Sequence, residues 1–228
     1  MVVLNNQVKA EKHVIGDELT YNGEVVLTYK AEYPQFYSKK NKMSLAVING
    51  YYRRKAESFK EYCETSLYNT LVELYKTELE HGIPIRRFEA LLTYEITYLE
   101  SCIISLYFDR YEYTGGAHGI TTRDSQTWNL QRNDMIKINR LINCPPDYKS
   151  YILGEIKNEI ERDKEAYFED YEELVAESFD SSSFYCTPRS VVVYFQQYDI
   201  APYASGIREF CFLYDSCAIN PVTMCSVK

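Results

Sequence analysis

The chain has 228 residues, 46% of them hydrophobic, which is enough apolar material for one substantial core and excludes a disordered chain. Its 33 acidic residues outnumber its 25 lysines and arginines and give a net charge of -8. An acidic chain without a basic face repels a phosphate backbone, so we expect no nucleic acid partner.

The chain carries no signal for a membrane. No apolar run approaches the roughly 20 residues that a membrane helix needs, and residues 1–13 lack a cationic start followed by an apolar core. The seven cysteines are odd in number and scattered, with no Cys-x-x-Cys pair, which is typical of free thiols in a reducing compartment. We therefore expect a cytoplasmic protein, or an extracellular or cell-surface one if an export signal has been removed.

The first half of the chain predicts a hairpin, a long helix and three strands. Residues 18–37 form short apolar runs on either side of Asn22-Gly23, a dipeptide suited to a tight hairpin turn. From 44 to 80, apolar residues recur at three- and four-residue steps, which predicts one amphipathic helix that Gly82 and Pro84 stop. Runs at 88–98, 102–113 and 118–130 then alternate in a period of two, which predicts an antiparallel meander.

The second half returns to helices and then to strands. After Pro145-Pro146 an apolar stripe predicts a helix that Asp147 caps, and a second helical segment follows at 168–175. Strands are expected at 184–187, 191–195 and 207–214, and a tail from 218. The predicted fold class is α+β, with an antiparallel β-sheet of meander and C-terminal strands packed against the long helix and a second helical segment.

Two loops with glycines follow strand-like runs and supply the candidate ligand-binding residues. The first loop, residues 113–119, reads YTGGAHG, and the second, 198–206, reads YDIAPYASG. Pro202 stiffens the second loop, so a tyrosine beside it loses little entropy on binding. The candidates are Tyr113, Gly115, Gly116, His118, Tyr198, Pro202 and Tyr203.

The order of five motifs along the chain resembles a known family. The motifs are Tyr33-Pro34, YTGGAHG at 113–119, TWNL at 127–130, FYCTPRSVVVYF at 184–195 and YDIAPYASGIREF at 198–210. In this order they resemble the bacterial DUF3298 and DUF4163 family. That family includes the sensor domains of lysozyme-responsive anti-sigma factors and accessory regions of peptidoglycan deacetylases.

The resemblance implies a non-catalytic binding or sensing module whose ligand is a lysozyme-like protein or a cell-wall glycan. It covers residues 20–215. We expect one compact α+β unit over 1–217 and a tail at 218–228. The alternative is two subdomains, a DUF4163-like one at 18–116 and a DUF3298-like one at 117–217. A cytoplasmic regulatory or interaction protein remains another alternative, and the sequence leaves the oligomeric state open.

An enzyme acting on cell-wall or carbohydrate substrates through His118 is the competing hypothesis. His118 lies between glycines, where backbone amides could bind an anion, but turn formation explains the same residues. A serine hydrolase built with Asp124 and Ser125 conflicts with strand geometry, because neighbouring side chains point to opposite faces. Glu95 and Glu100 leave a two-carboxylate glycosidase open. We expect no catalytic residues, metal ligands or cofactor.

Tyrosine and acidic residues offer two further surface hypotheses. The chain has 23 tyrosines against 10 phenylalanines. Tyrosine is a good binding anchor, although many tyrosines simply cover the half-buried faces of strands. The acidic stretch from Glu155 to Glu177 is typical of a solvated helix face, and it is also suited to steering a basic partner.

Overall fold

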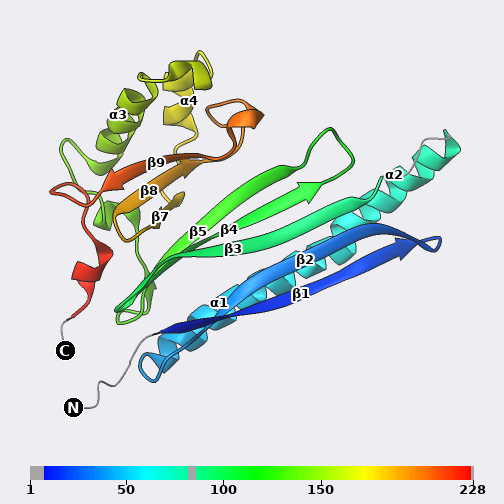
Figure 1. The fold of residues 1–228 in the computed structure, drawn as a ribbon, viewed down its shortest axis with the longest axis horizontal. Helices are drawn as coiled ribbons and strands as arrows, with labels where there is room; N and C mark the ends of the chain where they lie inside the picture. Colours follow the sequence, from blue (N-terminus) through cyan, green and yellow to red (C-terminus); the bar gives the residue numbers. More distant parts are fainter. Residues whose placement is uncertain (1–7, 82–85, 227–228) are drawn as a thin grey trace. The chain divides into compact units, whose positions relative to one another are not determined.

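A computed structural model describes residues 8–81 and 86–226 and confirms the α+β class (Figure 1). By its internal contacts the chain divides into two compact units. Unit 1 comprises Met1–Tyr94 with Phe108–Thr121, and unit 2 comprises Glu95–Tyr107 with Thr122–Lys228. Each unit therefore combines segments that are separated in the sequence.

The larger sheet begins with the predicted hairpin and continues through the meander. Asn22 and Gly23 form its turn with φ angles of 51° and 83°, which confirms that prediction. One pairing is parallel, since β2 runs alongside β3 from the pair Leu27 and Phe88 onward. The six strands, in the order in which they lie in the sheet, are β1 (Lys9–Tyr21), β2 (Glu24–Tyr37), β3 (Phe88–Glu100), β4 (Ile103–Tyr113), β5 (Ile120–Asn129) and β6 (Asp134–Met135).

The long helix connects the two parallel strands, because a parallel pair needs a crossover. It consists of α1 (Lys42–Tyr62), a π-helical segment (Cys63–Leu67) and α2 (Tyr68–Glu80), which confirms the predicted helix over 44–80. Its buried side chains include one at every fourth position: Phe59, Cys63, Leu67, Leu71 and Tyr75. The predicted stop at Gly82 and Pro84 lies outside the described residues.

Unit 2 contains the smaller, three-stranded antiparallel sheet. Its strands are β7 (Phe184–Cys186), β8 (Ser190–Phe195) and β9 (Arg208–Leu213), in that order. The C-terminal strands thus form a sheet of their own (Figure 1).

The helices of unit 2 are α3 (Tyr148–Ile160) and α4 (Tyr171–Glu177). Asp147 caps α3 as predicted, accepting hydrogen bonds from the amides of Lys149 and Ser150 at 2.9 and 3.0 Å. Within the described residues, unit 2 also has four 3-10 helices: Ile138–Arg140, Lys164–Ala166, Tyr203–Ser205 and Pro221–Met224.

The expectation of free thiols throughout is wrong for four of the seven cysteines. Cys102 is bonded to Cys225 and Cys144 to Cys217, across 123 and 73 residues respectively. The remaining three, Cys63, Cys186 and Cys211, are free, and only Cys211 is exposed. Spacing along the sequence could not reveal these pairs, because each bridge joins segments that only the fold brings together.

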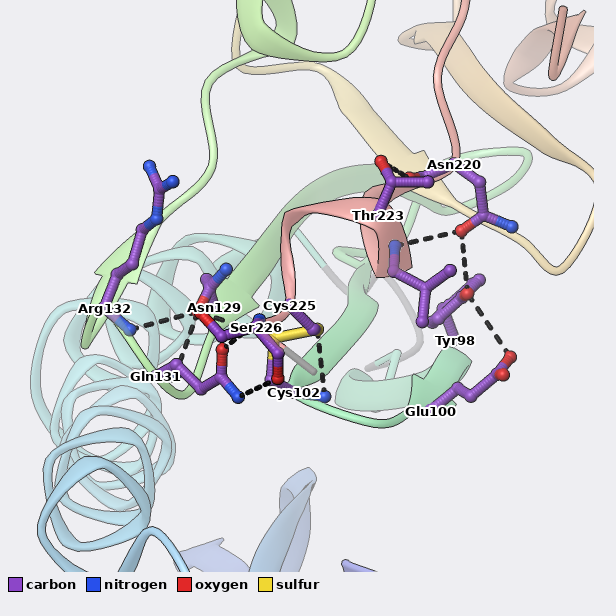
Figure 2. The surroundings of a disulfide bond; sticks show 11 residues. Tyr98, Glu100, Cys102, Asn129, Gln131, Arg132, Asn220, Thr223, Cys225 and Ser226 are labelled. Carbon is purple, nitrogen blue, oxygen red and sulfur yellow. Dashed lines mark hydrogen bonds between the residues drawn. A yellow bond between two sulfur atoms is a disulfide. The ribbon is translucent and has the colours of Figure 1, made fainter. Parts of the chain in front are cut away.

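The C-terminal segment is held in place and is not the free tail expected from residue 218. Figure 2 shows Cys225 bonded to Cys102 in the turn after β3. The amide of Ser226 donates to the Gln131 side chain at 2.7 Å, and the Tyr98 hydroxyl donates to Asn220 Oδ1 at 2.9 Å. These contacts make residues 218–226 part of unit 2.

We predict that removing the longer bridge destabilises the protein far more than removing a free thiol. Closing a loop of this length restricts the unfolded chain, so replacing Cys102 and Cys225 together by serine should cost about 4 kcal/mol in the free energy of unfolding. Denaturant unfolding measures this cost, with Cys211→Ser as the matched control. Equal stability of the two variants, or peptide mapping that finds other pairs, would contradict the assignment.

Candidate functional site

The first candidate loop, residues 113–119, is built around backbone geometry. Gly115 has a φ of 86°, and its carbonyl accepts a hydrogen bond from the Arg86 guanidinium. Gly119 is buried, and a Cβ added to it would overlap the ring of Tyr111. Both glycines are therefore required by the turn itself.

The other candidates in this loop sit around those glycines. Tyr113 is half-buried at the end of β4, and Gly116 is exposed. His118 is exposed, and its Nδ1 lies 3.4 Å from the carbonyl oxygen of Gly119. The arrangement is that of a strand-to-strand turn that carries a surface histidine.

The second candidate loop, residues 198–206, follows Gln196, which fastens the chain to β5. The Gln196 side chain accepts from the amide of Arg123 at 2.8 Å and donates to the Arg123 carbonyl at 2.7 Å. The amide of Gln196 donates to the Asp199 carboxylate at 2.8 Å, which closes a tight turn around residue 198. Ile200 is fully buried and Ala201 nearly so, so the middle of the loop anchors it to unit 2.

Two tyrosines project from this anchored loop. Tyr198 has a φ of 70°, which is rare for a residue with a side chain, and it is 48% exposed. Its ring lies against the half-buried ring of Tyr203, with centroids 5.7 Å apart. Pro202 is exposed and precedes the 3-10 helix, which ends at Gly206 with a φ of 66°. The turn thus presents an aromatic pair in a fixed conformation.

The side chain of Arg123, whose backbone bonds Gln196, contacts a strand of the larger sheet and a strand of the smaller one. The Arg123 guanidinium lies 3.6 Å from the centroid of the Tyr107 ring and forms an ion pair with Glu209. The Arg123 side chain is only 9% exposed, so the Tyr107 ring and the Glu209 carboxylate, and not water, stabilise its positive charge. Arg123 is not among the residues predicted from the sequence, because nothing in a single arginine on a polar strand marks a buried contact.

The residues of the hydrolase hypotheses have structural contacts. The Ser125 hydroxyl donates to the Phe184 carbonyl and lies 3.2 Å from the Tyr194 hydroxyl. Asp124 accepts from the Gln126 side chain at 2.7 Å. The hydroxyl of Ser125 therefore ties β5 to the smaller sheet.

The carboxylates of the glycosidase hypothesis each accept a hydrogen bond from a tyrosine. Glu95 accepts from the Tyr107 hydroxyl at 2.5 Å, and Glu100 lies 3.3 Å from the Tyr98 hydroxyl.

Neither loop lines two of the surface cavities found among the described residues. One of about 570 Å³ lies at the start of α1, between Lys9, Lys39 and Lys42 over an apolar floor that includes Phe36. The other, of about 480 Å³, lies beside β5 and includes Phe184. Neither is lined by His118, Tyr198 or Tyr203. His118, Tyr198 and Tyr203 therefore lie on the protein surface outside these two cavities.

The candidate binding residues are distributed over both units. The structure places in unit 1 Tyr113, Gly115, Gly116 and His118, and in unit 2 Tyr198, Pro202 and Tyr203.

Among the described residues, no group of three or more histidine, cysteine or acidic side chains is arranged to hold a metal ion. Nor does any described helix have the length and apolar character needed to cross a membrane.

Comparisons with known proteins match most of the chain. A family model described as "Deacetylase PdaC" matches residues 21–121, and "Protein of unknown function (DUF3298)" matches 136–215. A search of curated proteins gave no significant match.

Two solved structures share the fold. A DUF3298 family member from Bacteroides fragilis is similar with a TM-score of 0.70 and 20% identity, over 96% of this chain and 97% of that one. A DUF3298 family protein from Pseudomonas aeruginosa is similar with a TM-score of 0.53 and 13% identity, over 90% of this chain and 91% of that one.

We predict different effects of alanine at the two neighbouring glycines of the first loop. Gly115→Ala forces a side chain into the left-handed region and should lower the free energy of unfolding by about 1 kcal/mol. At Gly116 an added Cβ meets its nearest neighbour at 3.7 Å, an ordinary contact, so Gly116→Ala should be near neutral. Thermal unfolding compares the two, and equal effects would contradict the turn geometry.

We also predict that Asp199 is needed as an acceptor and not as a charge. Burial raises the pKa of its carboxyl, so the folded chain binds this proton more tightly than the unfolded chain does. At neutral pH, Asp199→Asn keeps an acceptor oxygen without the partly buried charge and should match or exceed the wild type in stability. This advantage should shrink as the pH falls through the raised pKa, where the wild-type carboxyl becomes neutral.

The matched control for this prediction removes the acceptor. Asp199→Ala leaves the Gln196 amide without its partner and should lower the free energy of unfolding by about 1 kcal/mol. Denaturant unfolding of the three proteins across a pH series gives the comparison. If the asparagine variant were as unstable as the alanine variant at neutral pH, the acceptor role would be wrong.

Proposed function

Because the chain belongs to the DUF3298 and PdaC-like family, we propose that it is a non-catalytic binding module that acts outside the cytoplasm and recognises a protein ligand through the Tyr198–Tyr203 pair. The observation that carries the proposal is this aromatic pair, the exposed Tyr198 against the half-buried Tyr203, on a loop that buried contacts hold in one conformation. The family match supplies the fold and its general context, and the loop supplies the contact surface.

The loop has the physical properties of a binding anchor. A tyrosine ring offers a large apolar face and a polar tip, and such rings carry much of the binding energy in protein interfaces. The Gln196 and Asp199 hydrogen bonds and the burial of Ile200 fix the loop before any ligand arrives. Binding therefore orders few groups, and the entropy cost of association is small.

Two features support a place outside the cytoplasm. Disulfides persist in oxidising compartments, and the chain has two that join distant segments. The resemblance to extracellular sensor domains points the same way. We therefore propose an extracellular or cell-surface location in place of the cytoplasmic expectation.

Charge favours a basic protein as the ligand. A chain with a net charge of -8 attracts a basic partner and accelerates the encounter. Lysozyme, to which the sensor domains in the resemblance respond, is the specific form of this proposal. A cell-wall glycan is the alternative ligand, since a sugar ring can stack on the same tyrosine faces.

The test is a binding titration with lysozyme and, separately, with soluble peptidoglycan fragments. Tyr198→Ala removes the exposed ring, and we expect it to weaken binding by about tenfold or more, a loss typical of interface anchors. Tyr37→Ala is the matched control, because Tyr37 is exposed to a similar extent, 44% against 48%, and lies in unit 1.

Two outcomes would overturn parts of the proposal. Absence of binding by the wild type to both ligands would remove the lysozyme and glycan forms. Binding that the Tyr198 and Tyr37 variants weaken equally, or that neither weakens, would show that loop 198–206 is not the contact surface.

A further inference from the structure

The edge of the larger sheet formed by β1 is long and open. In the described part of the chain β1 pairs only with β2 and is the end strand of the sheet (Figure 1). It has 13 residues, and none of them is buried. Val14, near its middle, is 53% exposed. A long edge of this kind presents unpaired backbone donors and acceptors to another strand.

The charges on β1 are distributed unevenly along its length. Lys9, Lys12 and His13 occupy the first half, with Glu11 as the one acidic residue among them, and Asp17 and Glu18 occupy the second half. In an antiparallel pair of identical strands, the first half of one strand lies opposite the second half of the other. Such a pair brings the basic half of each strand to the acidic half of its partner.

We propose that β1 pairs with β1 of a second copy of this chain, antiparallel and centred on Ile15, to join the two larger sheets. A two-fold axis perpendicular to the sheet leaves each side chain on the same face in both copies. Side chains on one face of a strand recur every two residues, so two residues that face each other must both have even numbers or both have odd numbers. Such a pairing is centred on one residue that faces its own copy, and only centres near the middle of β1 let the two strands pair over most of their length.

The charges select one of these registers. Centring on Ile15 places Lys12 opposite Glu18 on one face and His13 opposite Asp17 on the other. Centring on Val14 places Glu11 opposite Asp17, which repel each other, and centring on Gly16 places Ile15 opposite Asp17. Opposite charges stabilise directly facing pairs and like charges destabilise them, so the Ile15 register is preferred.

One contact within the chain must be exchanged on pairing, since the Glu18 amide donates to the Asp17 carboxylate at 2.8 Å, and the other contacts are compatible with it. The Lys12 ammonium lies 2.9 Å from the Glu32 carboxylate, yet its side chain is 56% exposed, and an ammonium has three donors. Ile15 is half-buried, and in the proposed pair its side chain lies beside Ile15 of the second copy on the same face of the joined sheet. Lysines on edge strands normally oppose pairing with another strand. In this register Lys12 faces an acidic residue, Glu18, and Lys9 faces a neutral one, Tyr21.

The first test is a charge exchange read by sedimentation, in a Cys211→Ser background that prevents disulfide bonding between copies through that exposed thiol. The wild-type edge should give a concentration-dependent dimer. Lys12→Glu places like charges opposite each other twice per dimer and should weaken association about tenfold, as should Glu18→Lys. The double variant restores complementarity and should recover association. Lys40→Glu, an exposed change outside β1, is the control.

The second test reads the register directly. At the two-fold axis, facing Cα atoms are about 4.5 to 5.5 Å apart, within reach of a disulfide, so Ile15→Cys should form covalent dimers on mild oxidation. Leu19→Cys, on the same face, should not, because its two copies would be about 27 Å apart along the strands. A chain that stays monomeric at high micromolar concentration, a dimer unaffected by the charge exchange, or equal crosslinking at both positions would overturn the proposal.

Discussion

Unit 2 depends on a covalent link between two parts of the chain that are far apart in sequence. The Cys102–Cys225 bridge connects the turn between β3 and β4 to the last described residues. The unit is assembled from residues 95–107, contributed by the middle of the meander, and from residue 122 onward. The bridge and the neighbouring hydrogen bond from Tyr98 to Asn220 join these two segments. The Cys186 amide, which donates to the Ser105 hydroxyl at 2.9 Å, joins β7 of the smaller sheet to β4.

The two candidate loops illustrate different uses of unusual backbone angles. In the first, Gly115 and Gly119 satisfy a turn in which a side chain would be strained or would overlap Tyr111. In the second, the unusual angle falls on Tyr198, which has a large side chain, and the hydrogen bonds of Gln196 and Asp199 keep it there. Strain that surrounding contacts maintain is commonly found at functional sites, and for that reason the second loop supports a binding role better than the first.

Much of the fold could be predicted from the sequence because local patterns encode it. The Asn22-Gly23 turn, the long helix, the Asp147 cap and the strands of the meander all follow from short-range periodicity and turn chemistry. The parallel pairing of β2 with β3 and the separation of the C-terminal strands into their own sheet depend on contacts between distant segments. The two disulfide bonds also depend on distant contacts. The odd number of cysteines does not predict them, because three of the seven thiols remain free. The loops were found from glycine and proline, but Arg123, which supports one of them, carries no local signal.

The π-helical segment in the long helix explains how one stripe of side chains keeps to a strict spacing of four residues. An α-helix turns about 100° per residue, so steps of four advance the stripe by about 40° each and would carry it away from the sheet over several turns. The wider π turn at Cys63–Leu67 cancels part of this drift and brings Leu71 and Tyr75 back to the side of Phe59. A regular α-helix over the same residues would turn α2 away from its partners, whereas loss of one residue there would restore a regular helix and leave the faces of α2 almost where they are. The length of this segment therefore acts as a phase adjustment between the two halves of the helix, and its register matters more than the identity of its exposed residues.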